Sequence, residues 1–151
     1  MLNYLFLCSG LVQINAVSGI GLADHSKSAF LELKRKRVHH YLIFRIDEKK
    51  NEVLVEKTGG PAENYDDYAE SLPRNDCQYA VYDFDFVTSE NCRKSKIFFI
   101  AWAPEISQTR AKMLYATSKD RLKSELDGVH YDIQATDSTE MDLEVISKRA
   151  R

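Results

Sequence analysis

Few side chains in this sequence combine the types and the spacing that catalysis requires. Asp83 and Asp85, in the segment YDFDF, alternate along an expected strand and so share one face, as a general acid and base would. The same spacing arises whenever a strand has a polar half, and Tyr82, Phe84 and Phe86 would form the apolar half. We therefore prefer this structural interpretation to a small hydrolase, whose turnover Asp83→Asn would abolish.

Other signatures of chemistry are also missing from the sequence. His39 and His40 are adjacent and would point apart on a strand, while His25 and His130 have no companion at ligand spacing. The three cysteines form no CxxC motif, and their odd number favours free thiols in a reducing compartment. The sequence contains no glycine-rich phosphate loop, no Ser/His/Asp signature and no HExxH motif. We expect no enzyme, no cofactor and no metal site.

A helical pattern with an unusual outer face lies in SQTRAKMLYATSKDRL, residues 107–122. At about 100° per residue, one arc forms a normal core-facing stripe. This stripe consists of Ala111, Leu114, Tyr115, Ser118, Leu122 and Leu126. The opposite arc contains Met113 among small residues, where charges are expected. Its margins carry Arg110 and Arg121 on one side and Lys112, Lys119 and Lys123 on the other. Because methionine is flexible and polarizable, this face suits a protein interface.

The charge of the chain is balanced overall but unevenly distributed. A net charge of -2 over 151 residues gives no global field that would attract nucleic acid. Basic runs lie at 34–37, 93–96 and 147–151, and acidic stretches lie at 47–52, 63–70 and 137–144. The run KRKR suits a solvated helix end, and it could also act as a nuclear import signal or a lipid contact. Separate basic patches favour a locally acidic partner, such as a protein surface or lipid headgroups.

The expected elements alternate in type along one domain. Strands are predicted at 40–47, 52–57, 77–87, 96–102 and 130–135, and helices at 24–37, 64–72, 106–126 and after 137. Asp24 would cap the first helix, and Asp137 with Glu140 has capping-box spacing for the last. GGP at 59–61 would break the chain. This order predicts an α/β (α+β) fold, a central mixed sheet sandwiched between helices, with the apolar run KIFFIAW as an interior strand.

The first residues differ in composition from the rest. MLNYLFLCSGLV resembles the apolar region of a secretory signal, but it lacks a positive n-region and is too short to span a bilayer. We therefore expect an uncleaved N-terminal extension at residues 1–15, followed by a single domain at 16–151, with no transmembrane segment.

Several segments together carry a family resemblance. They are AVSGIGLAD, FLELKRKR, NYDDYAESLP, CQYAVYDFDFVTSENCRKSKIFFIAWAPE, RAKMLYATSKDRL and DGVHYDIQATDSTEMDLEVI. In this order they resemble the actin-depolymerising factor/cofilin family, and its plant branch in particular, from Ala16 to Arg151. The resemblance implies a single domain with a mixed sheet between helices. It also implies a protein that binds actin monomers and filaments, favours ADP-actin, severs filaments and promotes monomer loss from pointed ends.

The resemblance further implies two binding surfaces. Monomer and filament binding would involve Ser18, Gly19, Arg110, Lys112, Met113 and Lys119. Filament-specific contacts would involve Lys94, Lys96, Lys148 and Arg149. Met113 would enter a hydrophobic cleft of actin while the flanking cations meet acidic residues, an attraction that salt weakens. Loss of the filament-specific surface should impair severing while monomer binding survives.

Regulation is implied by the same resemblance. Ser18 matches a regulatory serine, and a protein kinase would add about −1.5 to −2 charges there, which blocks docking. Phosphoinositide lipids would compete with actin for the basic surfaces. The family is pH-sensitive in places, which makes His130 a candidate titrating group. We expect a monomer in the cytoplasm, on the actin cytoskeleton, with the nucleus as a second location.

The extension before Ser18 leaves alternatives open. Family members carry this serine within a few residues of the terminus, whereas 17 residues precede it here. The extension could be disordered and harmless, obstruct docking, hide Ser18 from its kinase, or add a contact that makes the protein bundle or stabilise filaments. We expect the harmless case, because disordered termini are common. Low-speed pelleting of filaments that disappears on deletion of residues 1–14 would support bundling.

Overall fold

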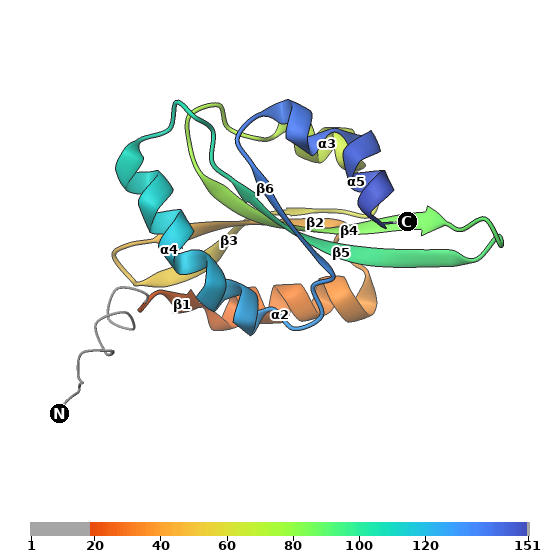
Figure 1. Cartoon of the computed structure of the whole chain (residues 1–151). Helices are drawn as coiled ribbons and strands as arrows, with labels where there is room; N and C mark the ends of the chain where they lie inside the picture. The colour runs from red at the N-terminus through yellow and green to blue at the C-terminus, as the bar shows by residue number, and fades with distance from the viewer. Residues whose placement is uncertain (1–18, 151) are drawn as a thin grey trace.

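Residues 19–150, which the computed structural model describes, contain a six-stranded sheet in the order β1-β3-β2-β4-β5-β6 (Figure 1). The strands are β1 (Gly21–Leu22), β2 (Tyr41–Asp47), β3 (Glu52–Gly59), β4 (Gln78–Val87), β5 (Arg93–Trp102) and β6 (Tyr131–Ala135). Neighbouring strands are antiparallel, except that β1 runs parallel to β3 and β6 runs parallel to β5. This topology confirms the mixed sheet that the sequence predicts.

Helices cover both faces of the sheet (Figure 1). One face carries α2 (Asp24–Leu31), the π-helical turn η1 (Glu32–Lys36) and α4 (Thr109–Glu125). The other carries α3 (Tyr65–Glu70), the 3-10 turn η2 (Ser138–Met141) and α5 (Leu143–Ala150). Side chains of β5 alternate between these layers, with Phe99 in the core under α2 and α4 and Phe98 in the core under α3 and α5. Both are fully buried, which confirms β5 as an interior strand.

The long helix α4 is fixed to the sheet through its inner stripe. Leu122 and Leu126 are only 1% and 2% exposed, and burial of one such side chain contributes about 1.5–3 kcal/mol. Tyr115 adds polar contacts, because its hydroxyl accepts the Ile46 N–H at 3.0 Å and its carbonyl accepts the Tyr79 hydroxyl. These contacts give α4 one orientation on the sheet and leave its opposite face to solvent.

Two predicted helix starts differ from the structure. Ala23, not Asp24, occupies the N-cap of α2, without a side-chain cap, and Asp24 is the first helical residue. Its negative charge still lies in the first turn, where the helix dipole favours it. The capping box of Asp137 and Glu140 is present, but it caps η2, and α5 begins later, at Leu143. The predicted cap at Asp24 was therefore wrong, whereas the capping box of Asp137 and Glu140 was predicted correctly although the element that it begins was not.

Gly59 was expected to break the chain, yet it is the last residue of β3 and pairs with Tyr41 of β2. A Cβ atom on Gly59 would lie 2.1 Å from a carbon of the Tyr41 ring, so the glycine is required by close packing and not by a turn. Sequence reasoning also missed β1, because two residues carry no readable periodicity. Strand β5 begins at Arg93 instead of 96, which places the run RKSK within the strand.

Candidate functional site

The solvent face of α4 is apolar at its centre. Met113 is 63% exposed, and Ile106, in the segment leading into the helix, is 75% exposed. Arg110, one turn before Met113, is exposed on the same side of the helix, and Ala116 and Thr117 are exposed one turn after it. The arc read from the sequence is therefore present in the structure, and we call these exposed residues of α4 its outer face.

The cations near Met113 are oriented by partners within the chain. Arg110 donates two hydrogen bonds to Glu48, from Nη1 to Oε2 at 3.1 Å and from Nη2 to Oε1 at 2.5 Å. The hydrogen bond from Arg110 lowers the pKa of the Glu48 carboxyl, so this pair is ionised at neutral pH. Lys112 donates from Nζ to the Glu105 carbonyl at 2.5 Å. Both cations on the flanks of Met113 in the sequence therefore have polar partners within the chain.

Lys119 does not lie with Arg110 and Met113. Its side chain is only 18% exposed, and its Nζ atom lies 3.2 Å from Asp132 Oδ2 and 3.1 Å from Gln134 Oε1, both on β6. Lys123 reaches the same carboxylate oxygen at 2.8 Å. Burial acts to raise the pKa of Asp132, but hydrogen bonds from the two lysines lower it overall. Lys119 thus attaches α4 to the sheet edge, and its ammonium group is not directed to the outer face.

Strand β1 runs beside the C-terminal half of α4 (Figure 1). Leu22 of β1 donates its backbone N–H to Glu125 Oε2 at 3.1 Å, and a Cβ atom on Gly21 would lie 3.2 Å from Arg121 Nη2. Gly19 is exposed just before these contacts. The structure therefore brings Gly19 and α4 to the same side of the protein. Ser18 and the expected extension lie outside the described residues.

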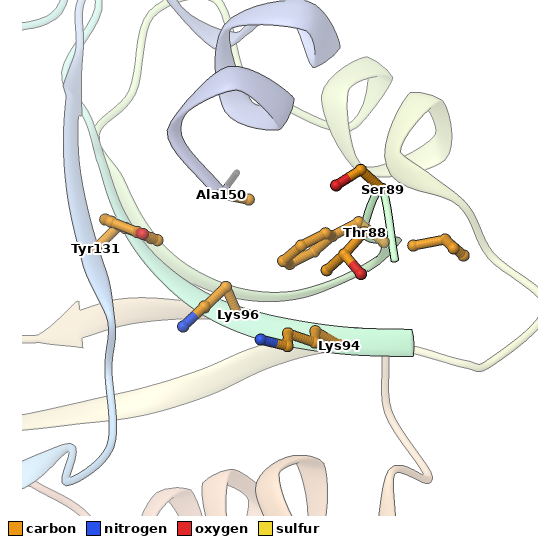
Figure 2. A pocket seen from close by; sticks show the side chains of 8 residues that line it. Thr88, Ser89, Lys94, Lys96, Tyr131 and Ala150 are labelled. Atoms are coloured by element: carbon orange, nitrogen blue, oxygen red, sulfur yellow. The ribbon is translucent and has the colours of Figure 1, made fainter. Parts of the chain in front are cut away.

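A second candidate surface is a pocket of about 590 Å³ between the β4–β5 hairpin, β6 and α5. It is lined by Phe86, Val87, Thr88, Ser89, Lys94, Lys96, Tyr131 and Ala150. Figure 2 shows Lys94 and Lys96 projecting from β5 on the side where Tyr131 and Ala150 lie. We call this site the basic pocket, because Lys94 and Lys96 are both among its lining residues.

Arg149 connects the C-terminal helix to the basic pocket. Its guanidinium lies over the ring of Tyr131, 6.0 Å from the ring centre, within the range of a cation–π contact. The structure thus gathers Lys94, Lys96 and Arg149 around one pocket. Lys148 is exposed on α5 and does not line it. Three of the four cations expected for filament-specific contacts are therefore neighbours in space.

The Asp83 and Asp85 pair has a structural environment. Asp83 is 4% exposed, and burial raises the pKa of its carboxyl while Arg37 acts in the opposite direction. Asp85 accepts a hydrogen bond from Arg37 Nη1 at 3.0 Å. The two aspartates share a strand face, as predicted, but an arginine side chain occupies the space beside them. This environment favours the structural interpretation over the hydrolase.

These features describe a mixed sheet sandwiched between helices that presents two separate candidate surfaces. The sequence profile of the family described as cofilin/tropomyosin-type actin-binding protein matches residues 19–151. The chain therefore belongs to the cofilin/actin-depolymerising factor family of actin-binding proteins. Among residues 19–150, no helix has both the length and the apolar character that crossing a bilayer needs.

Curated relatives and solved structures agree with this assignment. The chain is 74% identical over 137 residues to an actin-depolymerizing factor of Vitis vinifera. The aligned region covers 91% of this chain and 96% of the relative. It is 67% identical over 141 residues to actin-depolymerizing factor 6 of Arabidopsis thaliana, covering 93% and 97%. The crystal structure of Streptomyces griseoflavus cofilin superposes with a TM-score of 0.78 at 33% identity, covering 85% of this chain and 95% of that one. The resemblance to the plant branch is thus confirmed.

Proposed function

We propose that this protein binds actin monomers and filaments, prefers their ADP form, severs filaments and promotes depolymerisation from pointed ends. Membership of an actin-binding family supports the first part, and the printed names of the Vitis and Arabidopsis relatives support depolymerisation. Severing and nucleotide preference are the finer parts of the proposal. They rest on the resemblance and on the presence of two separate surfaces.

The observation that carries the proposal is Met113, 63% exposed on a helix whose inner stripe is buried. Transfer of an exposed methionine side chain from water into an apolar cleft is favourable in free energy. Its flexible chain also adapts to the shape of that cleft. Arg110 and Lys112 lie beside it and would meet carboxylates on actin. We assign monomer binding to these residues together with Ser18 and Gly19, and Lys119 would contribute by attaching α4 to β6.

The basic pocket suits the filament-specific role. The resemblance implies a second surface that contacts the neighbouring actin subunit of a filament, separate from the outer face of α4. Lys94, Lys96 and Arg149 offer a second, positively charged surface on other elements. Lys148 would add charge at the margin of that surface. A cation cluster of this kind also suits phosphoinositide headgroups, which would therefore compete with actin.

Sedimentation with pre-formed actin filaments tests this proposal. Wild-type protein should bind filaments and shift actin into the high-speed supernatant, whereas a variant with Arg110→Ala and Lys112→Ala should do neither. A variant with Lys94→Ala and Lys96→Ala should still bind ADP-actin monomers but should fail to sever. Comparison of ADP- and ATP-loaded monomers measures the nucleotide preference.

Several outcomes would contradict the proposal. Wild-type protein that stays in the supernatant with saturating filaments at low salt would exclude actin binding. Equal loss of monomer binding in both double variants would remove the distinction between the two surfaces. Pelleting of filaments at low speed would favour the bundling alternative, which deletion of residues 1–14 then tests.

Regulation of this activity is part of the proposal. A kinase acting on Ser18 would add negative charge to the residue that precedes Gly19 in the sequence, and this charge would oppose docking against acidic actin residues. Ser18→Asp should weaken monomer binding, and Ser18→Ala should not. We also propose a cytoplasmic monomer associated with the actin cytoskeleton, and a nuclear pool, which imaging of the full chain in cells would test.

A further inference from the structure

Arg37 joins both strands of the β4–β5 hairpin. Its Nη1 atom donates to Asp85 Oδ1 on β4 at 3.0 Å, and its Nη2 atom donates to Ser95 Oγ on β5 at 2.5 Å. Asp85 and Ser95 are direct cross-strand partners. We call these two contacts the Arg37 bridge. None of its three members belongs to the surfaces assigned above.

The backbone around Arg37 adopts a special conformation to make this contact. The helix that begins with α2 widens into the π-helical turn η1, and the Arg37 N–H donates to the Glu32 carbonyl five residues earlier, at 2.9 Å. Arg37 itself is left-handed, with φ of 56°, which costs free energy for a residue other than glycine. π-helical turns are rare and occur often at functional sites. The bridge therefore depends on an unusual end of the helix.

The bridge lies directly behind the basic pocket. Side chains alternate along a strand, so Ser95 points to the face that carries α2, while Lys94 and Lys96 on either side of it point to the opposite face. Across the hairpin, Lys94 pairs with Phe86 and Lys96 with Phe84. The turn of the hairpin extends beyond α2 and α5 (Figure 1), so few contacts from elsewhere determine its direction. Figure 2 shows the two lysines on this part of β5.

Charge explains why the hairpin needs Arg37. Asp83 and Asp85 are two carboxylates on one strand face, and Asp83 is buried. Like charges this close repel, and the cost is greater for a buried group. Of the charged groups near Asp83, Arg37 acts most strongly to stabilise its ionised form. Arg37 also links Asp85 on β4 to Ser95 on β5, so loss of either bridge contact removes a side-chain connection between the two strands that carry this part of the hairpin.

We propose that Arg37 is a positioning residue for the filament-specific surface, acting through Asp85 and Ser95 to set the direction of Lys94 and Lys96. This inference rests on the proposed function, because it assumes that the basic pocket contacts filaments. Arg37 itself lies on the other face of the sheet from the pocket, so it need not contact actin. Its loss should impair filament binding while monomer binding through α4 is retained.

Three variants separate positioning from direct contact. Arg37→Ala removes the bridge and one positive charge. Asp85→Asn keeps the charge of Arg37 but weakens the bridge. Arg35→Ala, on an exposed arginine for which the described residues provide no hydrogen bond or ion pair, removes the same charge from the same helix end without affecting the bridge. Circular dichroism and urea unfolding establish that each variant is folded. If Arg37→Ala does not fold, the more conservative Asp85→Asn tests the bridge in its place.

The measurement is the affinity of each variant for ADP-actin filaments, by co-sedimentation, and for ADP-actin monomers, by fluorescence titration. We expect Arg37→Ala and Asp85→Asn to weaken filament binding by about two- to fivefold, the effect of losing an exposed ion pair, with monomer affinity unchanged. Arg35→Ala should behave like the wild type in both. Amide hydrogen exchange at Lys94 and Lys96 should quicken in the first two variants only.

Other results overturn the inference. If Asp85→Asn strengthens filament binding or leaves it unchanged while Arg37→Ala weakens it, Arg37 contacts the filament directly. If Arg35→Ala weakens it as much as Arg37→Ala, the effect is one of net charge. Wild-type protein that binds neither form of actin would refute the proposed function and this inference together, whereas normal wild-type binding with unaffected variants refutes this inference alone.

Discussion

Glu48, in the turn between β2 and β3, holds Arg110 of α4 through two hydrogen bonds, although the two residues are 62 positions apart in the chain. Both side chains remain largely exposed, at 46% for Glu48 and 77% for Arg110. The pair therefore keeps the guanidinium at the surface, and Glu48 already uses two of its N–H donors. Binding of actin through Arg110 has to replace Glu48 or share the cation with it.

Glu48→Gln should strengthen monomer binding. The substitution removes the competing charge while leaving Arg110 in place, and we expect the Kd for ADP-actin monomers to fall by about two- to fivefold at low salt. Fluorescence titration of labelled actin measures the change. Glu56→Gln is the matched control, because it removes the same charge from β3, where Glu56 pairs with Arg45 at 3.7 Å. An equal rise in monomer affinity in both variants would mean that the change in net charge causes the effect. Weaker monomer binding by Glu48→Gln would mean that Glu48 orients Arg110 for actin.

Met113→Ala should reduce monomer affinity strongly without lowering stability. In the free protein Met113 is 63% exposed, so its truncation leaves no cavity. In a complex it would be buried, and loss of one buried apolar side chain weakens affinity by at least about tenfold. Val145→Ala provides a control, since Val145 is 42% exposed on α5, on the opposite side of the sheet. Unchanged monomer affinity in Met113→Ala would remove the outer face of α4 from the binding surface.

The parts of the fold that sequence could predict are those with strong periodicity. The apolar run in β5 identified an interior strand because both faces of the strand are buried, as Phe98 and Phe99 demonstrate. The two arcs of α4 were also readable, since a 17-residue helix repeats its pattern several times. Met113 was found because it interrupts the expected polar side. Periodicity therefore identified both the element and the outlier that suggests function.

The contacts that orient the site could not be predicted. Arg110 meets Glu48, and Arg37 meets Asp85, across 62 and 48 residues, and no local pattern indicates which exposed charges become partners. The turned-in position of Lys119 depends in the same way on Asp132 of β6. The tertiary structure determines which charged side chains pair. A sequence therefore shows which cations are present but not which of them remain directed to solvent.

Gly59→Ala should destabilise the fold, because the new methyl group would collide with the ring of Tyr41. Tyr41 is fully buried, and its hydroxyl donates to Glu63 Oε1 at 2.9 Å, so the ring has little freedom to move away. We expect the free energy of unfolding to fall by about 1–3 kcal/mol, as for overpacked cores, measured by urea denaturation. Gly60→Ala is the control, since a Cβ atom there meets no neighbouring atom within 4 Å. A cost shared equally by both variants would contradict the packing explanation.

The stability of the protein should decrease with acid through His130. The Nδ1 atom of this residue accepts the Ile97 N–H at 2.9 Å, so protonation of Nδ1 would break a bond at the start of the apolar part of β5. Desolvation, followed by the positive charges of Lys96 and Lys34, lowers the pKa of His130 below 6.5 in the folded state. The unfolded chain therefore binds the proton first as pH falls.

This order of protonation sets the pH window. Well above pH 6.5 the imidazole is neutral in both states and carries no penalty, and the free energy of unfolding should fall as pH drops through 6.5 toward the lower folded pKa. Urea denaturation in that range compares the wild type with His130→Asn, whose side-chain oxygen can still accept the Ile97 N–H but does not titrate. The pH dependence should be smaller in the variant, because one of the groups that releases its proton on folding is gone. An identical slope in both proteins would assign the acid sensitivity to other groups and leave His130 as a neutral acceptor that fixes the entry of β5.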